Sequence, residues 1–252
     1  MMKTGKAFRV WQRNFTVYKK LYMSSIAFNF VEPVLYLVAL GLGLGGFIKE
    51  INGVPYIKFI APGLIASSSM FAVATECTYG TYIRMAHQKT FDAILATPVG
   101  IDDLIAGEVL WGATKSAFYG AIITLVIVLF GLVDSPLIIL ALPVLVMSGL
   151  IFAEISLIAT ALAPGIDSFS YFFTLLLTPS FLFSGIFFPL DTLPPLVAKI
   201  AFFTPLYHLV NICRAFASGS LYSVRWDVVW LLAAAGLLAP YPFRLMRRRM
   251  IK

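Results

Sequence analysis

The chain has 252 residues, of which 60% are hydrophobic and 12% are charged. A soluble domain carries about 25% charged residues, so this chain has too few polar side chains to cover a water-facing surface. The formal net charge of +7 comes from residues that flank apolar segments. Composition and charge placement therefore exclude an ordinary soluble domain and nucleic-acid binding, and predict one α-helical membrane domain over residues 1–252.

Residues 1–25 combine basic and aromatic side chains at a helical period. Phe8, Trp11, Phe15, Tyr18 and Tyr22 recur at spacings of three and four, which places them on one helix face. Lysines and arginines occupy the other positions. This pattern predicts an amphipathic helix at the cytoplasmic membrane surface.

The first predicted membrane span covers residues 26–48. Its glycines at 41, 43, 45 and 46 have a spacing similar to that of a dinucleotide-binding loop. That interpretation is rejected because no strand precedes them and no acidic residue follows at the required distance. We interpret them as small residues that allow close helix packing in a bilayer.

Five further apolar segments are predicted to cross the membrane, and a polar stretch at residues 84–103 lies between the first two of them as a cytoplasmic loop. The five segments cover about residues 56–83, 106–133, 137–162, 169–188 and 228–243.

The segment 189–225 is the least regular part of the sequence. It has prolines at 189, 194, 195 and 205, yet residues 196–216 are strongly apolar, unlike a water-exposed loop. Its backbone polar groups would need protein partners at membrane depth. We therefore predict an outer re-entrant helical hairpin between the fifth and sixth spans.

The basic residues indicate how the chain is oriented. Thirteen of the 19 lysines and arginines lie in the N-terminal segment, the 84–103 loop and the C-terminal segment, and five lie in outer segments. This bias predicts a multi-pass protein with both termini in the cytoplasm. Such an arrangement requires an even number of spans, and six spans satisfy it.

The charged residues Glu76, Lys115 and Glu154 fall within predicted spans. A charge there costs about 2.5–3.5 kcal/mol unless it is compensated. Glu76 and Lys115 lie at matching depths, roughly 10–14 Å from the cytoplasmic boundary. We predict an ion pair between them, with separate exposure to a water-filled vestibule as the alternative.

Glu154 lies nearer the bilayer centre and could line a substrate path. Glu76 and Glu154 also leave open another class of function, an ATP-independent, proton-coupled secondary transporter.

The two histidines, His87 and His208, lie on opposite predicted sides of the membrane. We expect no metal site, no catalytic residue and no cofactor in this chain, because no acid, base or metal ligands converge.

Several stretches resemble a known family. The outer run FLFSGIFFPLDTLPPLVAKIAFFTPLYHLVNICRAFASG, residues 181–219, resembles the signature of type-2 ABC exporter membrane subunits. The inner run RMAHQKTFDAILATPVGIDDLIAGE, residues 84–108, is similar to the nodulation-factor exporter branch of that family. So are NFVEPVLYLVALGLGLG at 29–45 and FIAPGLIASSS at 59–69.

The resemblance implies a six-span permease that works as a dimer, with a second copy of itself and two copies of a cytoplasmic ABC ATPase subunit. The chain has no G-x-x-x-x-G-K-[ST] phosphate loop. ATP and Mg²⁺ would therefore bind to the partner subunit. The implied activity is export across a bacterial-type inner membrane, in contact with membrane lipids. A lipo-oligosaccharide or polysaccharide–lipid is the first expected cargo, and a hydrophobic drug or natural product the second.

The resemblance also implies roles for individual residues. Residues 84–97 would form a coupling helix that docks on the ATPase, a solvated loop being the alternative, and the outer hairpin would gate the path. His208 is interpreted as a packing and hydrogen-bonding residue, and Arg214 as a phosphate contact or an interfacial anchor. The coupling residues would be Arg84, His87, Gln88, Lys89, Phe91, Asp92, Ile94 and Leu95. The outer-gate residues would be Ser184, Gly185, Pro189, Pro194, Pro205, His208 and Arg214.

Overall fold

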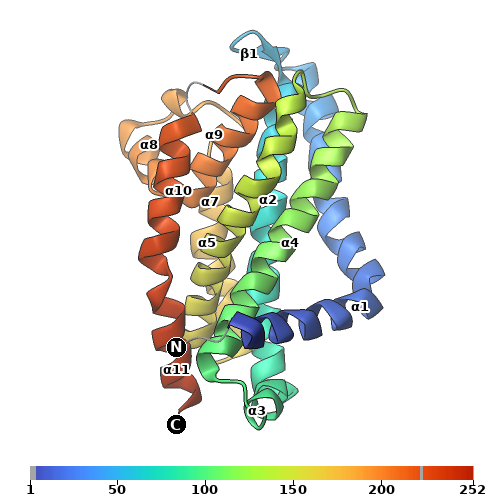
Figure 1. Ribbon diagram of the computed structural model, residues 1–252. Helices are drawn as coiled ribbons and strands as arrows, with labels where there is room; N and C mark the ends of the chain where they lie inside the picture. Colours follow the sequence, from blue (N-terminus) through green and yellow to red (C-terminus); the bar gives the residue numbers. More distant parts are fainter. Residues whose placement is uncertain (1–3, 222–223, 252) are drawn as a thin grey trace.

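The computed structural model describes residues 4–221 and 224–251, with the backbone alone for residue 4 and residues 21–30. Long helices run side by side, and a short antiparallel β-hairpin lies at one end (Figure 1). By length and apolar composition, five of the described helices can cross a membrane. They are Tyr56–His87, Ile101–Leu129, Pro136–Leu162, Ile166–Phe183 and Val224–Met250. The predicted all-α membrane fold is confirmed.

These spans are built from shorter elements. The second predicted span is α2 (Tyr56–Thr75) continued by two π-helical segments, η3 (Glu76–Gly80) and η4 (Ile83–His87). The remaining inner and central elements are α3 (Thr90–Leu95), α4 (Ile101–Leu129), η5 (Pro136–Leu140), α5 (Ala141–Leu162) and η6 (Ile166–Ser168). After these come α6 (Phe169–Phe172), η7 (Phe173–Leu177), α7 (Thr178–Phe183), α10 (Val224–Leu238) and α11 (Pro240–Met250).

The first predicted span is described only in part. Helix α1 (Thr4–Val38) continues into η1 (Ala39–Gly43) and η2 (Leu44–Gly46), and Val31–Gly46 forms a shorter apolar helix. In Figure 1 the first part of α1 lies across the base of the bundle, and its later part rises along it. Tyr22 and residues 26–30 of the predicted amphipathic face and span lie outside the described side chains.

The two ends of the bundle differ. The start of α1, α3 and the end of α11 lie at one end, whereas β1 (Glu50–Ile51), β2 (Val54–Pro55) and α8 (Pro195–Phe202) lie at the other (Figure 1). The structure thus places the beginning and the end of the described chain on the same side. That this side is cytoplasmic stays a prediction from the charge bias.

The outer segment contains two helices at a sharp angle. After η8 (Leu190–Thr192), α8 and α9 (Pro205–Ser218) are bent by 86° at a short break. Proline lies in the first turn of each helix, where its missing N–H costs no hydrogen bond. A broken span and a re-entrant loop both have this shape, so the re-entrant hairpin stays a prediction.

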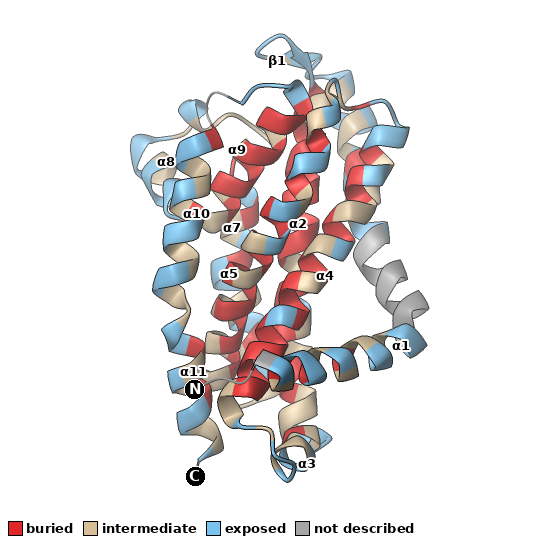
Figure 2. Cartoon of the chain, in the orientation of Figure 1, coloured by how far each residue is buried: buried red, intermediate tan, exposed pale blue. Residues whose placement is uncertain are grey.

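The core is centred on α2, which is buried along most of its length (Figure 2). It packs against α1, α4, α5 and α9. Small residues allow the helices to pack this closely. The four glycines of the first predicted span contribute less to close packing than the sequence suggests. A Cβ on Gly41 would lie 2.6 Å from Ile57 Cδ1, but one on Gly43 or Gly46 would meet no described atom within 4 Å.

One close helix approach involves a glycine on α5. A Cβ added to Gly149 would lie 2.5 Å from Ser116 Cβ and 2.8 Å from Ala113 Cα, both on α4. Replacing Gly149 with alanine should push the helices apart and lower the free energy of unfolding by about 1–3 kcal/mol. Thermal unfolding of the detergent-solubilised chain measures this, with Gly43→Ala as the control. Equal melting temperatures for the two variants would contradict the prediction.

Candidate functional site

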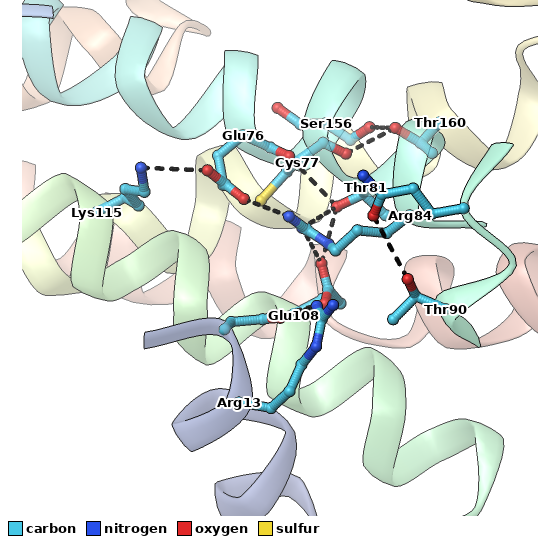
Figure 3. Close-up of polar contacts among 12 residues, drawn as sticks. Arg13, Glu76, Cys77, Thr81, Arg84, Thr90, Glu108, Lys115, Ser156 and Thr160 are labelled. Carbon is cyan, nitrogen blue, oxygen red and sulfur yellow. Dashed lines mark hydrogen bonds and ion pairs between the residues drawn. The ribbon is translucent and has the colours of Figure 1, made fainter. Parts of the chain in front are cut away.

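Four charged side chains meet inside the bundle near the end that carries α3, and Arg84 is at their centre (Figure 3). Arg84 Nη1 donates to Glu76 Oε1 at 2.6 Å, and Nη2 donates to Glu108 Oε2 at 2.6 Å. Lys115 Nζ lies 3.2 Å from Glu76 Oε2. We call Glu76, Arg84, Glu108 and Lys115 the ion cluster. Its two carboxylates and two cations balance each other.

Helical geometry explains why these side chains converge. Glu108 and Lys115 are seven residues apart on α4, so they lie two turns apart on one face. Glu76 and Arg84 are eight residues apart, which in a regular α-helix would rotate them by about 80° relative to each other. The wider π-helical turns of η3 and η4 reduce that rotation. Because α2 and α4 are antiparallel neighbours, both pairs meet near the same end.

Neutral side chains complete the hydrogen bonding of the Glu108 carboxylate. Thr81 Oγ1 donates to Glu108 Oε2 at 2.9 Å, and Asn14 Nδ2 donates to Glu108 Oε1 at 2.8 Å. The Glu108 side chain is 2% exposed. A buried ion pair is tolerated only when its remaining polar atoms are also bonded, and both Glu108 oxygens meet that condition.

Helix α1 takes part in the cluster through its aromatic face. Lys115 Nζ lies 4.1 Å from the centroid of the Tyr18 ring, a cation–π contact. The Trp11 indole donates to Thr114 Oγ1 at 2.8 Å. The aromatic face that the sequence assigned to the membrane surface thus packs partly on α4. On the same helix, burial and the positive charge of Arg84 lower the pKa of Arg13.

The predicted Glu76–Lys115 ion pair is present, but its setting differs from the prediction. The assignment of Arg84 to the docking surface is wrong, because its guanidinium bonds Glu76 and Glu108 inside the bundle. Sequence reasoning also missed Glu108. The signal was visible, since Glu108 has the helical spacing of two turns from Lys115. Glu108 also lies within the predicted span that covers residues 106–133.

The coupling segment is shorter than the predicted 84–97. Residues 83–87 continue the second span, and α3 has only six residues. Phe91 is 1% exposed and belongs to the core of this chain. Ile94 and Leu95 are half-buried against that core. The assignment of Phe91 as an anchor in a partner is therefore wrong, because one face of a short helix packs inward. His87, Gln88, Lys89 and Asp92 are exposed, as docking would require.

A groove runs between the start of α1 and α3. It has a volume of about 790 Å³. The basic residues Lys6, Arg9 and Arg13 line one side, and Ala93 and Ile94 belong to the other. The ammonium group of Lys6 also donates to the carbonyl of Pro98, in the loop after α3. The two segments therefore form one continuous surface, which is basic on the α1 side.

Glu154 lies apart from the ion cluster. It is on α5 and 6% exposed, and its Oε2 has no hydrogen-bond partner among the described residues. Glu76, by contrast, is paired with both Arg84 and Lys115. A proton-coupled mechanism would therefore have to use Glu154 rather than Glu76.

Arg214 faces the protein interior. Its Nη2 donates to the carbonyl of Gly185 at 2.8 Å, and its guanidinium carbon lies 4.0 Å from the centroid of the Phe59 ring. These contacts join α9, α2 and the turn after α7 within this chain. Gly185 has a φ of +81°, which favours glycine at that turn. Ser184 is buried and donates to the carbonyl of Phe181 at 3.2 Å.

His208 has the packing and hydrogen-bonding role predicted for it. Its Nδ1 lies 2.6 Å from Asp227 Oδ1, and its Nε2 lies 2.8 Å from the carbonyl oxygen of Phe202. The ring stacks on Trp230 with centroids 4.2 Å apart. His208 therefore joins α9 to α8 and α10. Among the other predicted gate residues, Pro194 and Pro205 mark the starts of α8 and α9, and Pro189 precedes η8.

Comparison with known proteins gives consistent matches along the chain. A family model described as ABC-2 type transporter matches residues 6–216. Nodulation protein J of Rhizobium meliloti (strain 1021) is 39% identical over 211 residues, covering 84% of this chain and 80% of that protein. Nodulation protein J of Rhizobium leguminosarum bv. trifolii is 37% identical over 250 residues, covering 96% and 93%. Inner membrane transport permease YadH of Escherichia coli (strain K12) is 23% identical over 202 residues, covering 80% and 78%.

Proposed function

Because this chain belongs to the ABC-2 type transporter family, we propose that it forms the export path of an amphipathic molecule driven by a separate cytoplasmic ATPase. The transporter would contain two copies of this chain and two ATPase subunits in a bacterial-type inner membrane, with both termini in the cytoplasm. ATP and Mg²⁺ would bind to the partner. The chain itself is a membrane permease and performs no chemistry on its cargo.

One observation carries the proposal. Two residues separate the end of η4 from the start of helix α3. Arg84 in η4 is bonded to Glu108 of α4, which is bonded in turn to Asn14 of α1. A displacement of α3 would therefore act on three helices that meet at the ion cluster. This is the arrangement expected of a part that converts the motion of a docked subunit into a rigid-body movement of membrane helices.

The docking surface would be the basic groove together with the outward face of α3. Its lysine and arginine side chains favour an acidic surface on the ATPase. ATP binding would bring the two ATPase subunits together and displace both copies of α3. Movement of α2 and α4 would then open a path at the interface between the two permeases.

The cargo we propose is a lipo-oligosaccharide or a polysaccharide–lipid, with a hydrophobic drug or natural product second. Support comes from the similarity to Nodulation protein J over nearly the whole chain. Aromatic residues make up 15% of the chain, and aromatic rings suit an amphipathic cargo.

Purification of the tagged chain from its native cell in mild detergent, followed by an ATPase assay, tests the proposal. We expect a stoichiometric subunit that contains a phosphate loop. Ala93→Arg, on the exposed side of α3, should reduce its recovery at least tenfold, a typical loss when a contact is disrupted at the centre of an interface.

The matched control is Val54→Arg, an equally drastic change on an exposed residue at the opposite end of the bundle. It should leave recovery unchanged. A chain that purifies alone and transports without ATP, but stops when the pH gradient is collapsed, would overturn the proposal in favour of proton coupling through Glu154.

A further inference from the structure

A small cleft lies between α1, α2 and α7, at mid-length of the Tyr56–His87 span. Its volume is about 20 Å³. A cavity of that size has room for about one water-sized group. Neither the ion cluster nor the docking groove includes it. Its walls contain polar and aromatic side chains in equal number, namely Glu32, Ser67 and Ser68 with Tyr36, Phe71 and Phe181.

The polar side chains of the cleft lack the partners that a buried site normally supplies. Ser68 is 4% exposed, and its hydroxyl has no hydrogen-bond partner among the described residues. Ser67 donates to the carbonyl of Leu64 at 3.3 Å and keeps its acceptor capacity. A buried hydroxyl without a partner costs about 1–3 kcal/mol, so Ser68 indicates an absent polar group.

Glu32, an exposed residue, adds a carboxylate to the lining of the cleft. It lies in the first predicted span and forms no ion pair with any described side chain. A carboxylate at membrane depth is costly unless something compensates it. Its charge would repel a phosphate or sulfate group. A neutral group that donates hydrogen bonds would satisfy it.

The aromatic rings form the apolar walls. The Phe181 ring lies 5.7 Å from the Tyr36 ring and 5.5 Å from the Phe71 ring, centroid to centroid, both in edge-to-face geometry. Pockets with mostly apolar and aromatic walls and a few convergent polar groups are typical of small-molecule sites. Here the polar side chains can accept and donate hydrogen bonds within a space that fits one hydroxyl group.

We propose that this cleft holds a hydroxyl group of the cargo's carbohydrate headgroup, with Ser68 and Glu32 as its hydrogen-bond partners. This proposal rests on the proposed export function and names where the headgroup is recognised. The rings of Tyr36, Phe71 and Phe181 form the apolar wall beside that hydroxyl, and the rest of the sugar lies outside the cleft. An alkyl chain alone would leave both polar side chains unsatisfied, so the site selects for the sugar.

Photocrosslinking of the purified chain in lipid nanodiscs tests this, with a dodecyl glucoside that carries a diazirine on the sugar as the probe. We expect labelled peptides to contain residues 31–36 or 64–71. Ser68→Ala and Glu32→Gln should each reduce labelling there about fivefold to tenfold, the effect of one lost hydrogen bond. Ser148→Ala and Glu50→Gln should leave it unchanged. Ser148 is another buried serine, bonded within its own helix, and Glu50 is exposed on β1.

Competition identifies the group that is recognised. Excess dodecyl maltoside should abolish the labelling, whereas dodecyl phosphocholine should not. Competition by dodecylamine instead would overturn the proposal, because it would show an ammonium site at Glu32. Labelling spread along the helices and insensitive to the variants would overturn it too. The ATPase partner is not needed in this experiment, so its result is independent of the purification test of the export function.

Discussion

Replacing Arg84 with methionine should lower the free energy of unfolding by about 3–5 kcal/mol and abolish export. The guanidinium bonds Glu76 and Glu108, and the Glu108 side chain is 2% exposed. Methionine has a similar length but leaves Glu108 as a buried carboxylate without its hydrogen-bonded cation. Unfolding of the purified chain in mixed micelles, monitored by circular dichroism, measures the loss.

A second substitution separates lost charge balance from lost packing. In the double variant Arg84→Met with Glu108→Gln, the cluster keeps the Glu76–Lys115 pair, and the glutamine can still bond Asn14 and Thr81. The free energy of unfolding of the double variant should be about 1–3 kcal/mol higher than that of Arg84→Met alone. Arg248→Met, on an exposed residue, is the control and should have no effect. A double variant no more stable than the single one would show that the cluster does not act through charge.

Replacing Phe91 with alanine should have a comparable effect on stability. The side chain is 1% exposed in the core of this chain, and removing a buried phenylalanine costs about 3–5 kcal/mol. The loosened α3 should also bind the ATPase more weakly. Thermal unfolding and recovery of the partner subunit are measured on the same preparation.

The comparison with Ala93→Arg makes the Phe91 result decisive. Ala93→Arg should weaken docking while leaving the melting temperature unchanged, because Ala93 is exposed. Phe203→Ala is the stability control, since Phe203 is 73% exposed at the opposite end. If Phe91→Ala melted like the unmodified chain and lost only the ATPase, Phe91 would be an anchor in the partner, as the family resemblance implies.

The membrane fold and most of its spans could be predicted from the amino-acid sequence. A bilayer requires long apolar helices, and composition along the chain records that requirement directly. The four central predicted spans correspond to Tyr56–His87, Ile101–Leu129, Pro136–Leu162 and Ile166–Phe183. The Glu76–Lys115 pair was also predictable, because depth follows from counting residues along two antiparallel helices.

The directions in which the other side chains point could not be predicted from the sequence and depend on how the helices pack. Arg84 points inward because the π-helical turns change the direction in which its side chain leaves the helix. No pattern of residues in the sequence predicted those turns. Asn14 of α1 and Asp227 of α10 complete the bonding of Glu108 and His208, which are far from them in sequence. Phe91 packs inward for the same reason. Hydropathy and charge report depth along the membrane normal, whereas rotation about each helix axis depends on neighbours brought together only by folding.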